Sequence, residues 1–263
     1  MRLDKYLALA SVGTRKAVRV MVREGKVQVN GELVLEPASE IHPEQDQIEV
    51  QNRVIGQTQK IYYMFHKPAG CVTARWDHKD KTVLDYFDSV QTEGLFPVGR
   101  LDKDTEGLLL FTNDGEFNHE LMKPEHHIEK TYLFWATGVL DESAKRSIQE
   151  GLLLKGEVER TKKAKLEIEK TGLFQEYKEE LVPLLSDIQF EKTEKLLRSN
   201  RPVLKGRLTI TEGRKHQVKR MLQAYGCQVI YLKRISIGRL KLDETLEKGS
   251  FRLLSQEEIQ SLK

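Results

Sequence analysis

The chain has 263 residues, of which 39% are hydrophobic and 32% are charged, and its formal net charge is +3. This length allows two domains, and no apolar run is long enough to span a bilayer. The two cysteines exclude a disulfide framework and a four-ligand cysteine zinc site, and the charged first residues are unlike a signal peptide, so we expect a cytoplasmic protein without a membrane segment.

The first residues have the signals of two short helices. Asp4–Ala10 is typical of a first helix. Thr14 is a favoured N-cap for a second helix that runs to about Glu24, and Gly25 is typical of a helix end.

A hairpin is predicted after these helices. The pair Asn30-Gly31 lies between two short segments that favour strands, and this pair is typical of a two-residue hairpin turn. Ile48–Val50 closes the module. We therefore place a small domain at residues 1–50, followed by a polar linker at residues 51–60.

The small domain is unevenly charged. Residues 1–30 carry seven basic side chains against two acidic ones, whereas residues 31–60 carry six acids against two basic side chains. A local basic surface on a nearly neutral protein indicates binding of a polyanion. The alternative is that these basic side chains are scattered over the surface and only contact water. The basic residues that we expect to bind the polyanion are Arg2, Lys5, Arg15, Lys16, Arg19 and Arg23.

Residues 61–263 mix strands and helices without a regular strand–helix–strand rhythm, which favours an α+β fold over a doubly wound one. The strand-like segments are residues 61–66, 95–98, 130–136, 163–169, 207–211 and 228–232, and the helix-like segments are residues 82–87, 117–122, 141–150 and 216–224. The charge-dense segment 171–203 separates two predicted strands that a short turn could join. We interpret it as an insertion.

The motif GRLDKDTEGLLLFTNDG, residues 99–115, places Asp102, Asp104 and Glu106 before an apolar run. Three interpretations compete for these acids. A calcium loop fits poorly, because Asn113 stands where a bidentate glutamate is required. A phosphoaspartate site needs an uninterrupted strand before the first acid, and Gly99 and Arg100 interrupt it. The third interpretation is a polar turn, which explains Asp104 and Glu106, while Gly107 lets the chain re-enter the sheet.

Four motifs resemble, in order, those of the RsuA-type ribosomal RNA pseudouridine synthases. They are HKPAGCVT at 66–73, the motif at 99–115, PEHHIEKTY at 124–132 and LTITEGRKHQVKRML at 208–222. The first fifty residues resemble the S4 RNA-binding domain that precedes the catalytic domain in this family. The resemblance covers nearly the whole chain except residues 171–203, and it implies a catalytic domain with a mixed, largely antiparallel sheet and a central cleft.

The resemblance implies roles for three residues. Asp102 matches the essential aspartate, Tyr132 matches the active-site tyrosine that stacks on an extruded base, and Lys219 matches the basic residue that keeps the aspartate ionised and oriented. A tyrosine in a strand such as KTYLFWA is also typical of simple packing. The reaction requires no cofactor and no metal.

Further RNA contacts are expected around this centre, from Arg100, Arg214, Lys215 and Arg220. Adjacent His126 and His127 lack a third ligand at a supporting spacing, so we interpret them as structural or RNA-facing rather than as metal ligands. Arg239 stands where the family pattern has proline, which leaves the contribution of the loop 237–240 open.

The sequence therefore predicts an enzyme that isomerises a uridine in small-subunit ribosomal RNA, free or within a partly assembled subunit, and that acts as a monomer. The alternatives are a large-subunit ribosomal RNA synthase and a non-catalytic RNA-binding or ribosome-assembly factor.

Overall fold

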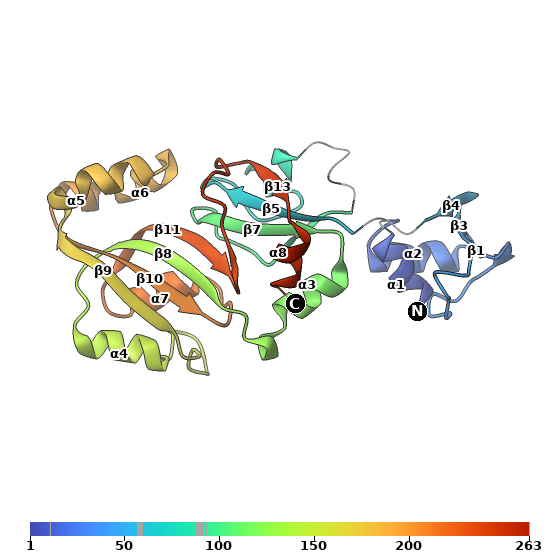
Figure 1. Ribbon diagram of the computed structural model, residues 1–263, viewed down its shortest axis with the longest axis horizontal. Coiled ribbons are helices and arrows are strands. Elements are labelled where there is room, and N and C mark those ends of the chain that lie inside the picture. The colour runs from blue at the N-terminus through green and yellow to red at the C-terminus, as the bar shows by residue number, and fades with distance from the viewer. Residues whose placement is uncertain (11, 57–59, 88–91, 93, 263) are drawn as a thin grey trace. The chain divides into compact units, whose positions relative to one another are not determined.

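A computed structural model of the protein describes residues 1–10, 12–56, 60–87, 92 and 94–262 (Figure 1). The chain divides into two compact units. The first consists of residues 1–62, 87–96 and 111–118, and the second of residues 63–86, 97–110 and 119–263. None of the helices described in these ranges is long and apolar enough to cross a membrane.

The N-terminal part of the first unit packs two helices on a four-stranded sheet. Its elements are α1 (Leu3–Leu9), α2 (Arg15–Arg23), β1 (Val27–Val29), β2 (Glu32–Leu33), β3 (Ile48–Val50) and β4 (Arg53–Ile55), and the strand order is β2-β1-β3-β4. The Thr14 side chain caps α2 by accepting from the amide of Ala17, as predicted. Asn30 and Gly31 both have positive φ at the β1–β2 turn, which a type I′ hairpin requires.

The predicted linker needs one correction. Arg53–Ile55 form β4 and pair with β3, so the linker prediction is wrong for these residues. Gln51 and Asn52 make the turn between the two strands with positive φ. The polar character of residues 51–53 reflects a tight turn and a solvent-facing edge strand rather than a connection between domains. Residues 57–59 of the predicted linker lie outside the described residues.

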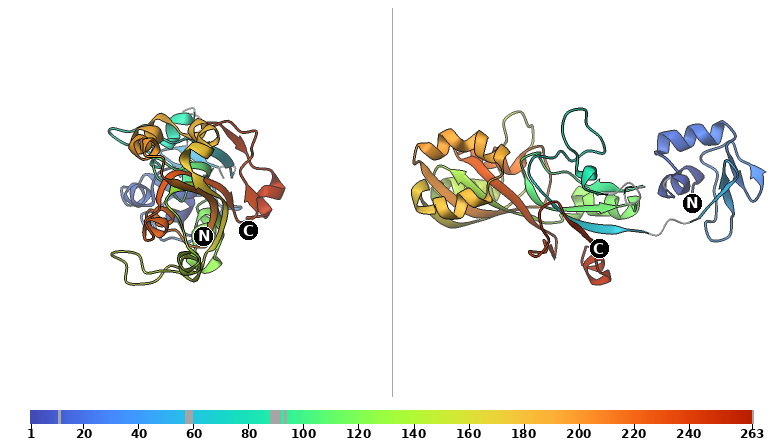
Figure 2. Two further views of the ribbon diagram at one scale, coloured as in Figure 1. Left: turned by 90° about the vertical axis from the view of Figure 1, so that its left-hand side faces the viewer. Right: turned by 90° about the horizontal axis from the view of Figure 1, so that it is seen from above.

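The larger sheet has nine strands and the expected mixed, largely antiparallel character. Its order is β13-β5-β7-β11-β8-β10-β9, with β6 paired to β7 and β12 paired to β11. Strands β7 and β11 pair in parallel, whereas the pairs β8–β10, β9–β10, β8–β11, β11–β12 and β5–β13 are antiparallel. The strands are β5 (Tyr62–Lys67), β6 (Phe96–Val98), β7 (Glu106–Thr112), β8 (Lys130–Thr137), β9 (Lys165–Leu173), β10 (Pro202–Ile210), β11 (Gln228–Ile237), β12 (Leu240–Lys241) and β13 (Phe251–Leu253). Figure 2 shows β8 to β11 running alongside one another.

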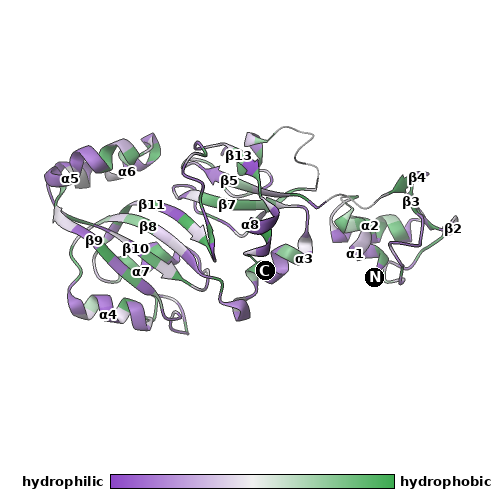
Figure 3. Ribbon diagram, viewed as in Figure 1, coloured by the Kyte–Doolittle hydropathy of each residue, from purple (hydrophilic) through white to green (hydrophobic). Residues whose placement is uncertain are grey.

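Strand β7 is buried along its whole length and is coloured mostly as hydrophobic in Figure 3. It lies between β5 and β11 in the sheet. Because alternate residues of a strand point to opposite faces and every residue of β7 is buried, both faces of the strand are covered. Gly107 has a φ of 105°, and a Cβ atom there would collide with the backbone of Arg234 on β11. This close approach, in addition to the positive φ, requires a glycine where the chain enters the sheet.

The helices cover the sheet and connect its strands. They are α3 (Gly115–Met122), α4 (Glu142–Glu150), α5 (Phe174–Leu181), α6 (Asp187–Arg198), α7 (Gln217–Gln223) and α8 (Gln256–Gln260), with short 3₁₀ turns η1 (Val83–Tyr86), η2 (Pro124–His126) and η3 (Val182–Leu184). Figure 1 shows α5 and α6 above the strands and α4 below them.

The predicted insertion is a helical excursion between two paired strands. Strands β9 and β10 are antiparallel neighbours, and α5, η3 and α6 occupy the connection between them. The predicted bounds are wrong by a few residues, because Thr171–Leu173 and Pro202–Val203 continue the two strands. Apolar side chains of this segment, including Phe174 and Leu181, pack with Trp135 in one buried cluster. The segment therefore shares the core of the sheet.

Candidate active site

The loop that carries Asp102 connects β6 to β7, and a buried lysine donates hydrogen bonds to its backbone. The side chain of Lys67, at the end of β5, has no exposed surface. Its Nζ atom donates to the backbone carbonyls of Pro68 at 3.1 Å, Asp102 at 3.0 Å, Lys103 at 3.4 Å and Thr105 at 3.0 Å. Burial lowers the pKa of Lys67 below its ordinary value, against the opposing effect of Cys71 and nearby acids. One ammonium group thus fixes the path of the loop.

Asp102 and Lys219 meet as the sequence predicted. Lys219 lies on α7, and its Nζ donates to Oδ2 of Asp102 at 2.9 Å. The two side chains are 28% and 23% exposed, so the pair is partly shielded from water but remains accessible. A lysine at this distance makes a charge-assisted hydrogen bond that fixes the direction of the carboxylate.

Asp104 is more than a part of the turn. The same Nζ of Lys219 lies 2.5 Å from Oδ1 of Asp104, and Lys192 of α6 lies 3.2 Å from its Oδ2. Burial alone would raise the pKa of Asp104, but Lys219 and then Lys192 outweigh burial and hold that pKa below its usual range. Asp104 lies in a turn, as predicted, but its side chain is held by two lysines. Asp104 shares its cation with Asp102.

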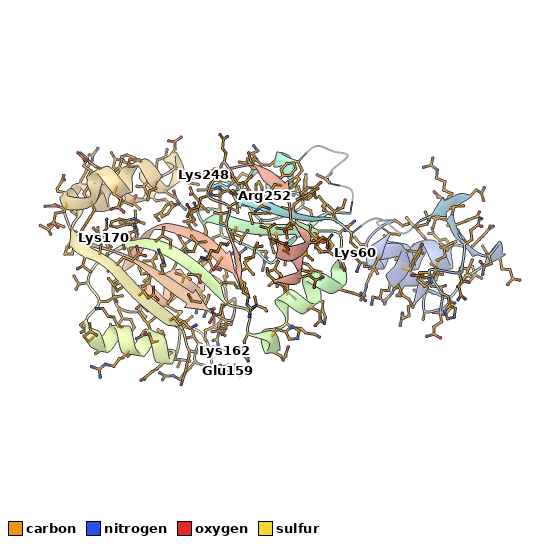
Figure 4. All side chains as sticks on the ribbon, viewed as in Figure 1. Lys60, Glu159, Lys162, Lys170, Lys248 and Arg252 are labelled. Carbon is orange, nitrogen blue, oxygen red and sulfur yellow. The ribbon has the colours of Figure 1, made fainter. Side chains whose placement is uncertain are left out.

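Glu106 is not part of a solvated turn. It has no exposed surface, at the start of β7, where Tyr231 donates to its Oε2 at 3.1 Å and Lys248 lies 2.8 Å from the same oxygen (Figure 4 labels Lys248). Burial, and then the charge of Glu106, raise the pKa of the Tyr231 phenol. Glu106 is a buried, paired carboxylate that joins β7 to β11.

His216, for which the sequence predicts no role, lies near the same aspartate. Its Nε2 atom lies 3.6 Å from Oδ1 of Asp102, on the side opposite Lys219. The residue precedes α7 and has a φ of 53°, in the left-handed region. The side chain of Gln217 stabilises this turn, since it accepts from the amide of Arg214 and donates to Glu212. The sequence could have indicated His216 through its spacing from Lys219, because residues three positions apart lie on the same side of a helix.

Helix α6 contacts the Asp102 loop, which gives the predicted insertion a place in the site. Gln189, 2% exposed, donates from Nε2 to the carbonyl of Asp104 at 2.9 Å, beside the Lys192 contact. The side chain of Gln189 is fixed in turn by Ser186, whose amide and hydroxyl both donate to its Oε1. The segment between β9 and β10 therefore supports the loop from the side.

Tyr132 lies with Asp102 at a cavity of about 560 Å³. This volume is in the range typical of small-molecule sites, which suits one extruded nucleotide. Tyr132, on β8, is 9% exposed, so its ring is mostly packed and presents one part to the cavity. Residues of the loop, of α3, of β8 and of β11 line the cavity: Val72, Thr73, Val98–Lys103, Leu121, Met122, Lys130, Tyr132, Gly213–His216, Arg234 and Ile237.

Of the arginines and lysines predicted to bind RNA near this cavity, two have guanidinium groups already engaged within the protein. Arg214 donates to the carbonyls of Glu159 at 2.8 Å and Arg160 at 2.7 Å, and Arg220 contacts Glu157 at 2.8 Å. Arg100 and Lys215 are exposed and line the cavity. RNA binding by these four residues stays a prediction, and Arg100 and Lys215 are the better placed.

In the first unit, the predicted basic surface is only partly free. Asp4 is 2% exposed and binds both Arg2, at 3.0 Å, and Arg19, at 2.7 Å. Arg15, Lys16 and Arg23 are exposed on α2, whose buried residues are Val18 and Val22. Helix α2 therefore presents basic side chains to solvent while Asp4 orients two of the predicted arginines.

The two adjacent histidines point to different partners. His126 lies 3.6 Å from Glu120, and Nδ1 of His127 lies 3.0 Å from Nζ of Lys162. Among the described residues, no group of three or more histidine, cysteine or acidic side chains gathers as metal ligands do.

Arg239 is exposed in the turn between β11 and β12, next to Gly238 with a φ of 54°.

Comparison with known proteins decides the family. The model of the RNA pseudouridylate synthase family matches residues 61–224, and that of the S4 domain matches residues 1–48. The chain belongs to the RNA pseudouridylate synthase family. It is 38% identical over 264 residues to the ribosomal small subunit pseudouridine synthase A of Haemophilus influenzae, covering 100% of this chain and 99% of that protein.

Two further comparisons extend over the whole synthase. The chain is 34% identical over 263 residues to the ribosomal large subunit pseudouridine synthase B of Bacillus subtilis, covering 100% of this chain and 95% of that protein. A crystal structure of a pseudouridylate synthase is 37% identical, with full coverage of both chains and a TM-score of 0.65. The prediction of an S4 domain followed by a pseudouridine synthase domain is confirmed.

Proposed function

We propose that this synthase isomerises a uridine of small-subunit ribosomal RNA, with Asp102 as its catalytic residue. The observation that carries the proposal is the contact between Asp102 and Lys219 beside a nucleotide-sized cavity that Tyr132 also lines. An ionised, oriented and accessible carboxylate is what a carboxylate nucleophile or base requires.

The reaction needs no net exchange of atoms apart from protons. The N1–C1′ bond of uridine breaks, the base turns, and a C5–C1′ bond forms, while C5 loses a proton and N1 gains one. Asp102 can attack C1′, add to C6 or remove a proton from the sugar. Tyr132 would stack on the extruded base, and its phenol is placed to move a proton.

The identities to the relatives support the small subunit as the source of the substrate. The identity to the small-subunit synthase A of Haemophilus influenzae is 38%, against 34% to the large-subunit synthase B of Bacillus subtilis. The S4 domain, through the exposed basic residues of α2, would hold the RNA backbone and so give affinity with little sequence information. We further propose that the protein acts as a monomer in the cytoplasm, on ribosomal RNA that is free or partly assembled.

The test uses ribosomal RNA labelled with tritium at uridine C5, because isomerisation releases this label. We expect release from small-subunit RNA or its assembly intermediates and none from large-subunit RNA, with no effect of chelators. Reverse-transcription stops after carbodiimide treatment would map the modified position. Release from large-subunit RNA alone would reassign the substrate, and release from neither RNA would favour a non-catalytic binding or assembly factor.

A further inference from the structure

Two basic side chains, Lys130 and Arg234, line the cavity but have no role in the proposed reaction. In the antiparallel pair of β8 and β11, Arg234 stands opposite Tyr132. Lys130 is two residues before Tyr132 on β8, and side chains two apart in a strand share a face. Lys130, Tyr132 and Arg234 all line the cavity. Two cations therefore lie on the same face as the tyrosine predicted to stack on the base.

Neither cation has a carboxylate partner among the described residues. Arg234 is 3% exposed, its Nε donates to the carbonyl of Leu108 at 2.8 Å, and its Nη2 has no hydrogen-bond partner there. Nζ of Lys130 donates to the carbonyl of Ile128 at 3.0 Å. Asp102, the acid that lines the cavity, is engaged by Lys219 and His216.

Burying two like charges without a counter-ion is costly. Burial, and then the charge of Arg234, lower the pKa of Lys130 to about 8. A bound anion would relieve both effects. The arrangement is therefore incomplete in the free protein and fits a negatively charged group that arrives with the substrate.

We propose that Lys130 and Arg234 form an anion subsite that binds a backbone phosphate of the substrate RNA next to the extruded uridine. The inference rests on the proposed function for the identity of the ligand. A phosphodiester supplies one negative charge and several acceptor oxygens, which suit an ammonium group and an unsatisfied guanidinium nitrogen. Such a contact would fix the position of the sugar relative to Asp102.

The first test compares affinities for small-subunit ribosomal RNA by equilibrium filter binding. Lys130→Met should weaken binding about tenfold, as expected for a charged hydrogen bond, and lower the slope of log affinity against log salt by about 1. The control is Lys145→Gln on α4, which removes an equal charge from a surface ion pair with Glu142. This control should change neither quantity. Unchanged affinity and slope in Lys130→Met would overturn the subsite.

The second test uses pH, because Lys130 must be protonated to bind the phosphate. The other charged or titratable side chains that line the cavity are Arg100, Asp102, Lys103, Tyr132, Arg214, Lys215, His216 and Arg234. They stay in place in Lys130→Arg, which keeps a permanent charge. Affinity of the wild type should fall above pH 8 by up to about tenfold per pH unit, and this fall should be absent in Lys130→Arg. The same fall in both proteins would contradict the proposal.

These binding measurements separate the two proposals. A wild type that binds RNA but releases no tritium overturns the proposed function, and the comparison of Lys130 variants still tests the anion subsite. A wild type that releases tritium, with an affinity that does not depend on Lys130, overturns the subsite alone.

Discussion

Lys219 Nζ lies 2.9 Å from Oδ2 of Asp102, although the two residues are 117 positions apart in the chain. The same nitrogen contacts Asp104, so one lysine pairs with two carboxylates of a single loop. Without it, the two carboxylates would repel each other in a partly buried site. Lys219 is therefore expected to orient Asp102 and to compensate the charge of the loop.

Replacing Lys219 by Met should lower the limiting rate of tritium release by about 100-fold or more, the scale of losing one preorganised charged donor. Lys219→Arg should recover part of the rate, because it keeps the charge but not the geometry of the ammonium group. Single-turnover release measures both variants. A Lys219→Met variant that folds and retains near-normal rates would remove this residue from the active site.

Asp102→Asn should abolish release while leaving RNA affinity within a few-fold of the wild type. Asp104→Asn is the matched control, since it makes the same chemical change two residues away beside the same lysine. We expect this control to slow release without abolishing it, because Asp104 orients Lys219 rather than contacting the uridine. Substantial activity in Asp102→Asn would show that the catalytic assignment is wrong.

Lys67→Met should lose both stability and activity. The carbonyls of Asp102, Lys103 and Thr105 would lack their shared donor, which we expect to lower the free energy of unfolding by about 3 kcal/mol. Urea denaturation and release at a temperature where the variant is folded would measure the two effects.

The comparison for this variant is Lys248→Met, which unpairs the buried Glu106 without touching the loop carbonyls. It should lose stability but keep the rate of the folded enzyme. If the two variants lose the same fraction of the release rate, the hydrogen bonds from Lys67 to the loop carbonyls have no particular role in catalysis.

Gln189→Leu tests the contact of α6 with the loop. Loss of the bond to the Asp104 carbonyl should lower the limiting rate by about three- to tenfold, as expected for one neutral hydrogen bond. Glu191→Gln, on the exposed part of the same helix, should have no effect. If Gln189→Leu releases tritium as fast as the wild type, the segment between β9 and β10 serves only the core.

Lys130 should also affect stability in the absence of RNA. Its pKa is lowered from 10.5 to about 8 in the folded protein, so the unfolded chain binds more protons between these values. The free energy of unfolding attributable to Lys130 therefore rises with pH through this window, and the folded protein bears a cost below pH 8. Urea midpoints at pH 7 should be higher for Lys130→Met than for the wild type. A lower midpoint would mean that the ammonium group stabilises the free protein.

Much of this protein follows from local sequence. Thr14 before an amphipathic segment, Asn30-Gly31 between short strands, and the apolar run after Gly107 each specify their structure through neighbouring residues alone. The order of four motifs also indicated the family and the meeting of Asp102 with Lys219. These features depend on spacing along the chain, which the sequence records directly.

The tertiary structure decided which polar residues matter around that pair. Glu106 and Asp104 belong to the same alternating acids, yet one is fully buried against Tyr231 and the other shares Lys219. The roles of Lys67 and Gln189 depend on carbonyls that fall within their reach only when distant strands and helices pack together. By itself the sequence predicted most of the elements, because these depend on local patterns, and its motifs indicated Asp102 as the candidate catalytic aspartate. Burial and the pairing of charges are properties of the packed chain, and only the fold determines them.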